Sequence, residues 1–118
     1  MTIGELLRES TRSQNPADAE HLLAHVVKQP RTWLLAHPEA KVSAVKMKRY
    51  ARLITRRARG EPLSYLIGSQ PFFGLNFIVN RSVLIPRPES EWLVTESLKN
   101  LAGHPNIRTI VDVGTGSG

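Results

Sequence analysis

The sequence has 118 residues, of which 41% are hydrophobic and 22% are charged, a balance typical of a globular protein with one small domain or one domain and part of another. No apolar run reaches the ~20 residues of a membrane-spanning helix, and the N-terminal residues lack the basic and then apolar order of a signal peptide. The absence of cysteine excludes disulfides and thiolate metal sites, which is simplest to explain by a reducing compartment, so we expect a cytoplasmic protein. The net charge of +6 favours acidic partners.

Capping residues and hydrophobic spacing predict two helices at the N-terminus. Thr2 and Glu5 have the spacing of a capping box. Asn15 can cap a second helix, with Pro16 at the first helical position, where its missing amide costs little. Apolar residues then recur at helical spacing, namely Ile3, Leu6 and Leu7 in the first helix and Ala19, Leu22, Leu23, Val26 and Val27 in the second.

Three further helical segments complete an expected N-terminal bundle over residues 1–68. Pro30 and Pro38 bound a short helix at best. The best-defined helix runs from a cap at Ser43 to about Arg59, and the next segment, up to Gly68, adds one or two helical turns. The apolar stripe expected on the long helix consists of Met47, Tyr50, Ile54 and Ala58.

The composition changes after Gly68. Residues 69–86 are rich in aromatic and β-branched residues around Gly74, which predicts a β-hairpin linker. A helix is expected to begin between Pro88 and Ser90, with Val94, Leu98 and Leu101 facing inward.

Residues 109–113 form a short apolar run typical of a buried strand, and a Gly-rich loop follows it. Helix, strand and Gly-rich loop in this order predict that residues 87–118 are the start of an α/β Rossmann-like domain. A single strand has no sheet to join, so we expect the residues after about Asn100 to be disordered or mispaired in this chain.

The loop after this run has the pattern Asp-x-Gly-x-Gly-x-Gly. It consists of Asp112, Gly114, Thr115, Gly116, Ser117 and Gly118. Glycines after a strand let a ligand approach the backbone closely. A carboxylate at Asp112 would repel a pyrophosphate but suits the cationic methionyl group of S-adenosylmethionine. The spacing therefore favours S-adenosylmethionine over a dinucleotide, and a tight turn without a ligand is the alternative.

Half of the 16 Lys and Arg residues lie between Glu39 and Glu61, where there is no acidic residue. They predict a basic stripe on the long helix that binds an acidic protein face or ribosomal RNA, or else is simply a solvated face. The proposed partner-binding residues are Lys48, Arg49, Arg52, Arg56 and Arg59.

His21 and His25 share a helix face, but no third ligand is evident, so we expect surface histidines and no metal.

Residues 56–94 and the final loop together resemble the peptide chain release factor glutamine methyltransferases, the HemK/PrmC family. The matching features are Gly60-Glu61-Pro62-Leu63, Phe73-Gly74, Leu84-Ile85-Pro86-Arg87-Pro88-Glu89, and Asp112 to Gly118. The resemblance implies transfer of a methyl group from S-adenosylmethionine to the glutamine side-chain amide of the Gly-Gly-Gln motif in class-1 release factors.

The resemblance also assigns roles to parts of this chain. The helical N-terminal region would recognise the release factor, Asp112 and the loop Gly114–Gly118 would bind the cofactor, and Pro86, Arg87, Pro88 and Glu89 would line the edge of the cleft. The Asn-Pro-Pro-Tyr motif that holds the glutamine amide in the family is absent. We therefore expect that this chain is not catalytic alone and that the catalytic residues lie downstream of Gly118. We also expect a monomer.

Two alternatives stay open at the level of the sequence. Adenine-N6 methyltransferases that act on DNA or RNA share the Gly-rich loop. A helical module that docks a protein or RNA through its basic helix would need no enzymatic activity.

Overall fold

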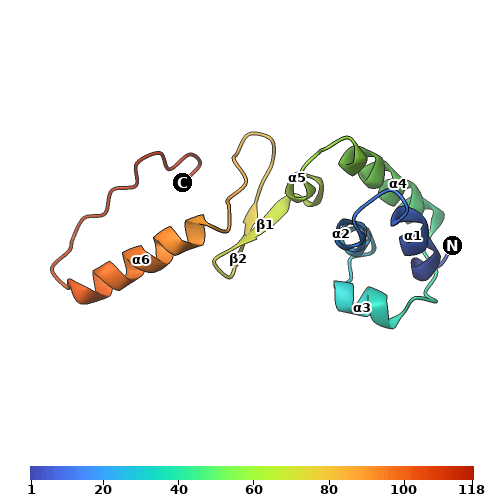
Figure 1. Ribbon diagram of the computed structural model, residues 1–118, viewed down its shortest axis with the longest axis horizontal. Coiled ribbons are helices and arrows are strands. Elements are labelled where there is room, and N and C mark those ends of the chain that lie inside the picture. The colour runs from blue at the N-terminus through green and yellow to red at the C-terminus, as the bar shows by residue number, and fades with distance from the viewer. The chain divides into compact units, whose positions relative to one another are not determined.

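The computed structural model describes residues 1–118, which form two compact units, Met1–Ile67 and Gly68–Gly118. The first unit contains helices α1 (Ile3–Ser10), α2 (Pro16–Val27), α3 (Arg31–Ala36), α4 (Ala44–Ala58) and α5 (Leu63–Ile67) (Figure 1). The second contains strands β1 (Ser69–Phe72) and β2 (Leu75–Ile78) and helix α6 (Ser90–Gly103). The predicted helices are therefore confirmed, and the predicted hairpin forms over residues 69–78, while residues 79–86 of the predicted linker are irregular.

None of the six helices combines the length and the apolar character that crossing a membrane requires.

The first turn of α1 is held by its own cap and by a distant loop. The Thr2 amide donates to Glu5 Oε2 at 2.7 Å, and the Glu5 amide donates to Thr2 Oγ1 at 3.3 Å, which is the predicted capping box. The first of these bonds lowers the pKa of the Glu5 carboxyl because it favours the charged form. The Gly4 amide donates to the Pro38 carbonyl at 2.9 Å, and a Cβ on Gly4 would lie only 3.3 Å from that oxygen. This close approach explains a glycine inside the helix.

The caps of α2 and α4 also follow the sequence signals. The Ala17 amide donates to Asn15 Oδ1 at 2.9 Å, and the Lys46 amide donates to Ser43 Oγ at 3.4 Å. At the other end of α2, Lys28 adopts a left-handed conformation with φ of 63°.

Helix α2 lies at the centre of the first unit and contacts α1, α3, α4 and α5. Ala19, Leu22 and Leu23 on α2 and Leu34 on α3 are completely buried. Tyr50 on α4 is buried against α2, and its hydroxyl donates to the Ala19 carbonyl at 3.3 Å. Burial raises the pKa of this hydroxyl.

The apolar stripe predicted on α4 needs one correction. Tyr50 is buried, and Met47 and Ile54 pack against the core, as expected. Ala58 is exposed, however, and Leu53 is buried. Leu53 lies three residues after Tyr50 and therefore on the same face, whereas Ala58 is the last residue of the helix.

The second unit begins with the hairpin, in which Ser69 pairs with Ile78 and Phe72 with Leu75. Phe73 and Gly74 form its turn with φ of 48° and 73°. The two left-handed residues match a primed turn, which follows the twist of a two-residue hairpin. The Phe73 amide donates to Glu91 Oε1 at 2.8 Å, so the start of α6 holds the tip of the hairpin.

The Rossmann-like start expected over residues 87–118 is not confirmed. Helix α6 buries no residue, and Leu98, expected to face inward, is exposed. Helix α6 continues past Asn100 to Gly103, where the sequence predicts disorder. The expected strand at residues 109–113 is irregular, and Val113 is 91% exposed. A strand is stabilised by its neighbours, and these residues pair with no other strand.

The buried position of α2 makes Leu22 a strong test of the first unit. We expect Leu22→Ala to lower the free energy of unfolding by about 3 kcal/mol, because the substitution removes buried methyl groups and leaves a cavity. Val45→Ala is the control, since Val45 is 78% exposed and its truncation should change stability by less than about 0.5 kcal/mol. Urea unfolding followed by circular dichroism measures both. Equal effects would contradict the assignment of α2 as the centre of the core.

Candidate functional site

The Gly-rich loop and the Pro86–Arg87 segment lie around one hollow in the second unit. The hollow has a volume of about 490 Å³. Its lining includes Pro86, Arg87, Asp112 and the loop residues Gly114 to Gly118, together with Phe77 and Val94. Pro88 and Glu89, which were predicted at the same edge, are not among the lining residues. The Gly-rich loop and the Pro86–Arg87 segment, which both carry the family resemblance, therefore line the same hollow, whereas Pro88 and Glu89 do not.

The backbone of the loop requires its glycines. Gly114, Gly116 and Gly118 have φ of 78°, 66° and 104°. These values lie in the left-handed region that L side chains rarely adopt, although a Cβ at any of the three positions would meet no atom within 4 Å. The glycines are thus needed for the shape of the loop and not to avoid a steric clash.

The basic stripe predicted on α4 divides into two groups. Lys48, Arg52 and Arg59 are exposed, and their side chains have no hydrogen-bond or ion-pair partner. Their spacing places them on one face of α4, opposite Tyr50 and Leu53. We call Lys48, Arg52 and Arg59 the outer basic face.

The other two predicted residues have partners inside the bundle. Arg56 Nε donates to Glu61 Oε2 at 2.7 Å, and this carboxylate raises the pKa of the guanidinium. Arg49 reaches His25 on α2. The next residue, Arg57, pairs with Asp18 at 2.8 Å and ties the last turn of α4 to the first turn of α2.

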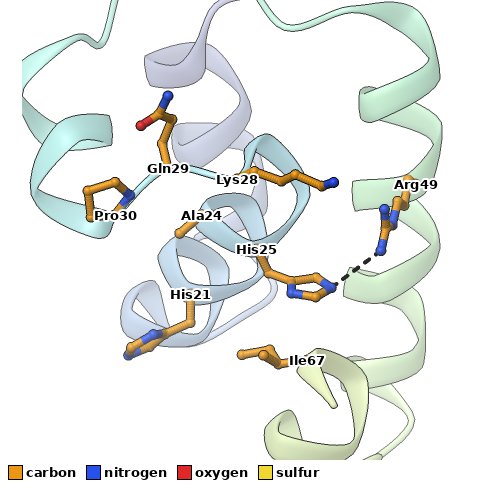
Figure 2. A pocket seen from close by; sticks show the side chains of 8 residues that line it. All are labelled: His21, Ala24, His25, Lys28, Gln29, Pro30, Arg49 and Ile67. Carbon is orange, nitrogen blue, oxygen red and sulfur yellow. Dashed lines mark hydrogen bonds between the residues drawn. The ribbon is translucent and has the colours of Figure 1, made fainter. Parts of the chain in front are cut away.

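A second pocket of about 480 Å³ lies between α2, the α2–α3 turn, α4 and α5 (Figure 2). Its lining residues are His21, Ala24, His25, Lys28, Gln29, Pro30, Arg49 and Ile67. We call it the His25 pocket. Arg49 Nη2 lies 3.4 Å from His25 Nε2. A guanidinium can only donate, so Nε2 is the acceptor and His25 is neutral in this geometry.

Burial lowers the pKa of His25, and the nearby charges of Arg49 and Lys28 lower it further. The spacing of His21 and His25 predicts their shared helix face, but it does not predict the positions of Arg49 and Lys28 beside them. The contact between His25 and Arg49 spans 24 residues, and no sequence signal indicates it. No group of three or more His, Cys, Asp or Glu side chains in residues 1–118 is arranged to hold a metal ion.

Comparison with known proteins gives a consistent result. Residues 2–68 match the family described as the PrmC N-terminal domain. A protein of Coxiella burnetii named release factor glutamine methyltransferase is 44% identical over 110 residues, which are 92% of this chain and 39% of the relative. Proteins of the same name from Xylella fastidiosa and Burkholderia pseudomallei are 41% and 43% identical over 96% and 99% of this chain. The chain spans about two fifths of the length of these relatives.

The environment of His25 predicts how stability depends on pH. A histidine with a lowered pKa binds a proton less readily in the folded state than in the unfolded state. Stability should therefore fall as the pH drops below the ordinary histidine value of 6.5. We expect His25→Gln to reduce this loss between about pH 7.5 and about pH 5.5, measured by urea unfolding. Arg49→Gln should reduce it in part, because burial remains. An unchanged slope in His25→Gln would contradict the assignment.

Proposed function

Because this chain belongs to the PrmC N-terminal domain family, we propose that it is part of an S-adenosylmethionine-dependent enzyme that methylates the glutamine side-chain amide in class-1 release factors. The observation that carries the proposal is the family match over residues 2–68, together with relatives of one name that align along nearly the whole chain. The chain covers about two fifths of those relatives, so the proposal concerns the activity of the full-length enzyme.

The proposed role of the bundle is to recognise the release factor. The outer basic face supports this role because Lys48, Arg52 and Arg59 are exposed and their charges are not neutralised within the chain. Such a surface steers an acidic partner and favours one orientation on encounter. Arg49 and Arg56 were included in the predicted surface, and we propose a smaller contribution from them because Arg56 is paired with Glu61 and Arg49 points to His25 and lies outside the outer basic face.

The proposed role of the loop Asp112–Gly118 is to bind the cofactor. When bound, S-adenosylmethionine supplies a methyl group on a cationic sulfonium. The left-handed glycines let the backbone approach a ligand closely, and the Asp112 carboxylate attracts a positive methionyl group. Pro86 and Arg87 line the same hollow, which supports their proposed place at the edge of the cleft. Pro88 and Glu89 do not line this hollow.

The recognition role follows from the difficulty of the reaction. An amide nitrogen is a poor nucleophile, so much of the rate must come from holding it in line with the bond that breaks. Binding the release factor through a separate helical unit supplies that orientation without a contact to the reacting atoms.

Methyl transfer by the full-length enzyme tests the proposal. Purified class-1 release factor and S-adenosylmethionine are incubated with the enzyme, and the peptide that carries the Gly-Gly-Gln motif is analysed by mass spectrometry. We expect one added methyl group on the glutamine. Methylation of DNA or RNA adenine instead would support the alternative enzyme class. Binding of the release factor without any methyl transfer would support a docking module.

The loop geometry predicts a cofactor-binding defect. In the full-length enzyme we expect Gly116→Ala to weaken S-adenosylmethionine binding about tenfold or more, because alanine is strained at φ of 66° and the loop must change shape. Gly103→Ala is the matched control, since Gly103 lies in α6 and does not have a positive φ. Isothermal titration calorimetry measures both. Equal affinities of the two variants for S-adenosylmethionine would contradict a role of the loop in binding the cofactor.

The outer basic face predicts a defect in recognition rather than in chemistry. We expect Arg52→Glu with Arg59→Glu to raise the KM for the release factor about tenfold and to leave kcat nearly unchanged. Arg12→Glu is the control, because Arg12 is exposed and lies on the turn after α1. Steady-state kinetics at low and high salt measure the effect, which salt should diminish. A loss of kcat at constant KM would contradict a role in docking.

A further inference from the structure

We propose that the His25 pocket binds the carboxylate of an acidic side chain of a protein partner. This inference does not rest on the proposed enzyme activity or on the outer basic face. It rests on the side chains that line the pocket and on their unused hydrogen-bond donors.

Positive groups reach the pocket from two elements, and no lining residue is acidic. Figure 2 shows the His25 ring between α2 and Arg49 on α4, with Lys28 on the turn after α2. The two acidic residues of α2 already have partners: Glu20 accepts a hydrogen bond from Arg31 Nε at 3.1 Å, and Asp18 accepts one from Arg57 Nε at 2.8 Å. The cations at the pocket therefore have no anion of this chain to neutralise them.

Arg49 and Lys28 keep most of their donors unused. The guanidinium of Arg49 makes one long contact, 3.4 Å to His25 Nε2, and the Lys28 ammonium has no partner. A guanidinium has five N–H donors in a planar fork that matches the two oxygens of a carboxylate. The geometry thus leaves room for a bidentate bond from Arg49 to an incoming carboxylate, with Lys28 as a second donor.

The position of Lys28 is a separate observation. It follows the last residue of α2 in a left-handed conformation with φ of 63°, where glycine is the common residue. A lysine at such a site costs of order 1 kcal/mol in backbone strain. The lysine places a positive charge at the rim of the pocket, which a glycine would not do.

The remaining lining favours a carboxylate on an aliphatic stem over a phosphate. Ala24, Pro30 and Ile67 present apolar surface that can contact the methylene groups of a glutamate. A nucleic-acid phosphate lacks such an aliphatic stem, so the apolar part of the lining favours a protein side chain over nucleic acid.

Binding is coupled to a proton on His25. Lys28 on the turn and Arg49 on α4 are the charges that act on this ring, His21 lines the same pocket, and α5 contributes no group that is charged at neutral pH. Arg31 on α3 contacts His21 and is paired with Glu20 on α2, and Lys46 on α4 contacts the Val27 carbonyl. A bound carboxylate would attract a proton to His25 and so oppose the effect of the two cations. Affinity for the carboxylate should therefore rise as the pH falls from about 7.5 to about 5.5.

The experiment uses the 118-residue chain and a capped peptide of alanines with one central glutamate, compared with the same peptide carrying glutamine. The His25 ring signals are followed by NMR across a pH titration. We expect the glutamate peptide to raise the pKa of His25 by about one unit, which corresponds to about tenfold tighter binding to the protonated form. Propionate and propionamide form a second pair that tests a free small acid.

Three variants separate the pocket from the general positive charge of the protein. Arg49→Gln should abolish the difference between the glutamate and glutamine peptides, while Arg59→Gln, which removes the same charge from the outer basic face of α4, should preserve it. His25→Gln should retain carboxylate binding and lose its pH dependence. Retained ring and backbone shifts elsewhere in the bundle would show that each variant is folded.

The outcomes decide the proposal. Equal binding of the glutamate and glutamine peptides, or equal losses in Arg49→Gln and Arg59→Gln, would overturn it. Binding of propionate without binding of the glutamate peptide would overturn the assignment to a protein side chain and indicate a site for a free small acid.

Discussion

The burial of α2 is the constraint on which the first unit depends. Its helices have between five and fifteen residues, lengths that are marginal for a helix in water. Each of the other four contacts α2, and Leu22 and Leu23 on α2 are completely buried in the hydrophobic core. The hydrophobic contact with α2 therefore supplies the stability that the short helices lack, and it also fixes which face of α4 points outward.

The orientation of α4 divides the charges of that helix into paired and unpaired groups. Arg57 reaches Asp18 at the start of α2, and Arg56 reaches Glu61 just before α5, so these two pairs help to hold the helices together. Both pairs are partly exposed, so solvent weakens them and each makes only a small contribution to stability. The arginines that stabilise the bundle are thus distinct from Lys48, Arg52 and Arg59, which are exposed and have no partner within the chain.

Sequence reasoning succeeded where the signal is local and failed where it is not. Thr2, Asn15 and Ser43 act within a few residues of their own positions, so the three caps could be predicted. The buried position of Leu53 and the contact of Arg49 with His25 depend on how α4 meets α2. The predicted strand at residues 109–113 has suitable composition, but β-propensity is realised only beside another strand, and none is paired with it.

The two units obtain their order in different ways. The first unit has a contiguous core drawn from α1 to α5, whereas Val79, at 4% exposed, is the only buried hydrophobic residue of the second unit. The second unit relies more on individual polar contacts, such as the bond from the Phe73 amide to Glu91, and on the backbone conformation of its glycines. A few polar contacts resist local opening less than a packed core does. A ligand that binds the Gly-rich loop would therefore add a larger share of the order in the second unit than a partner bound to the first unit would add to the bundle.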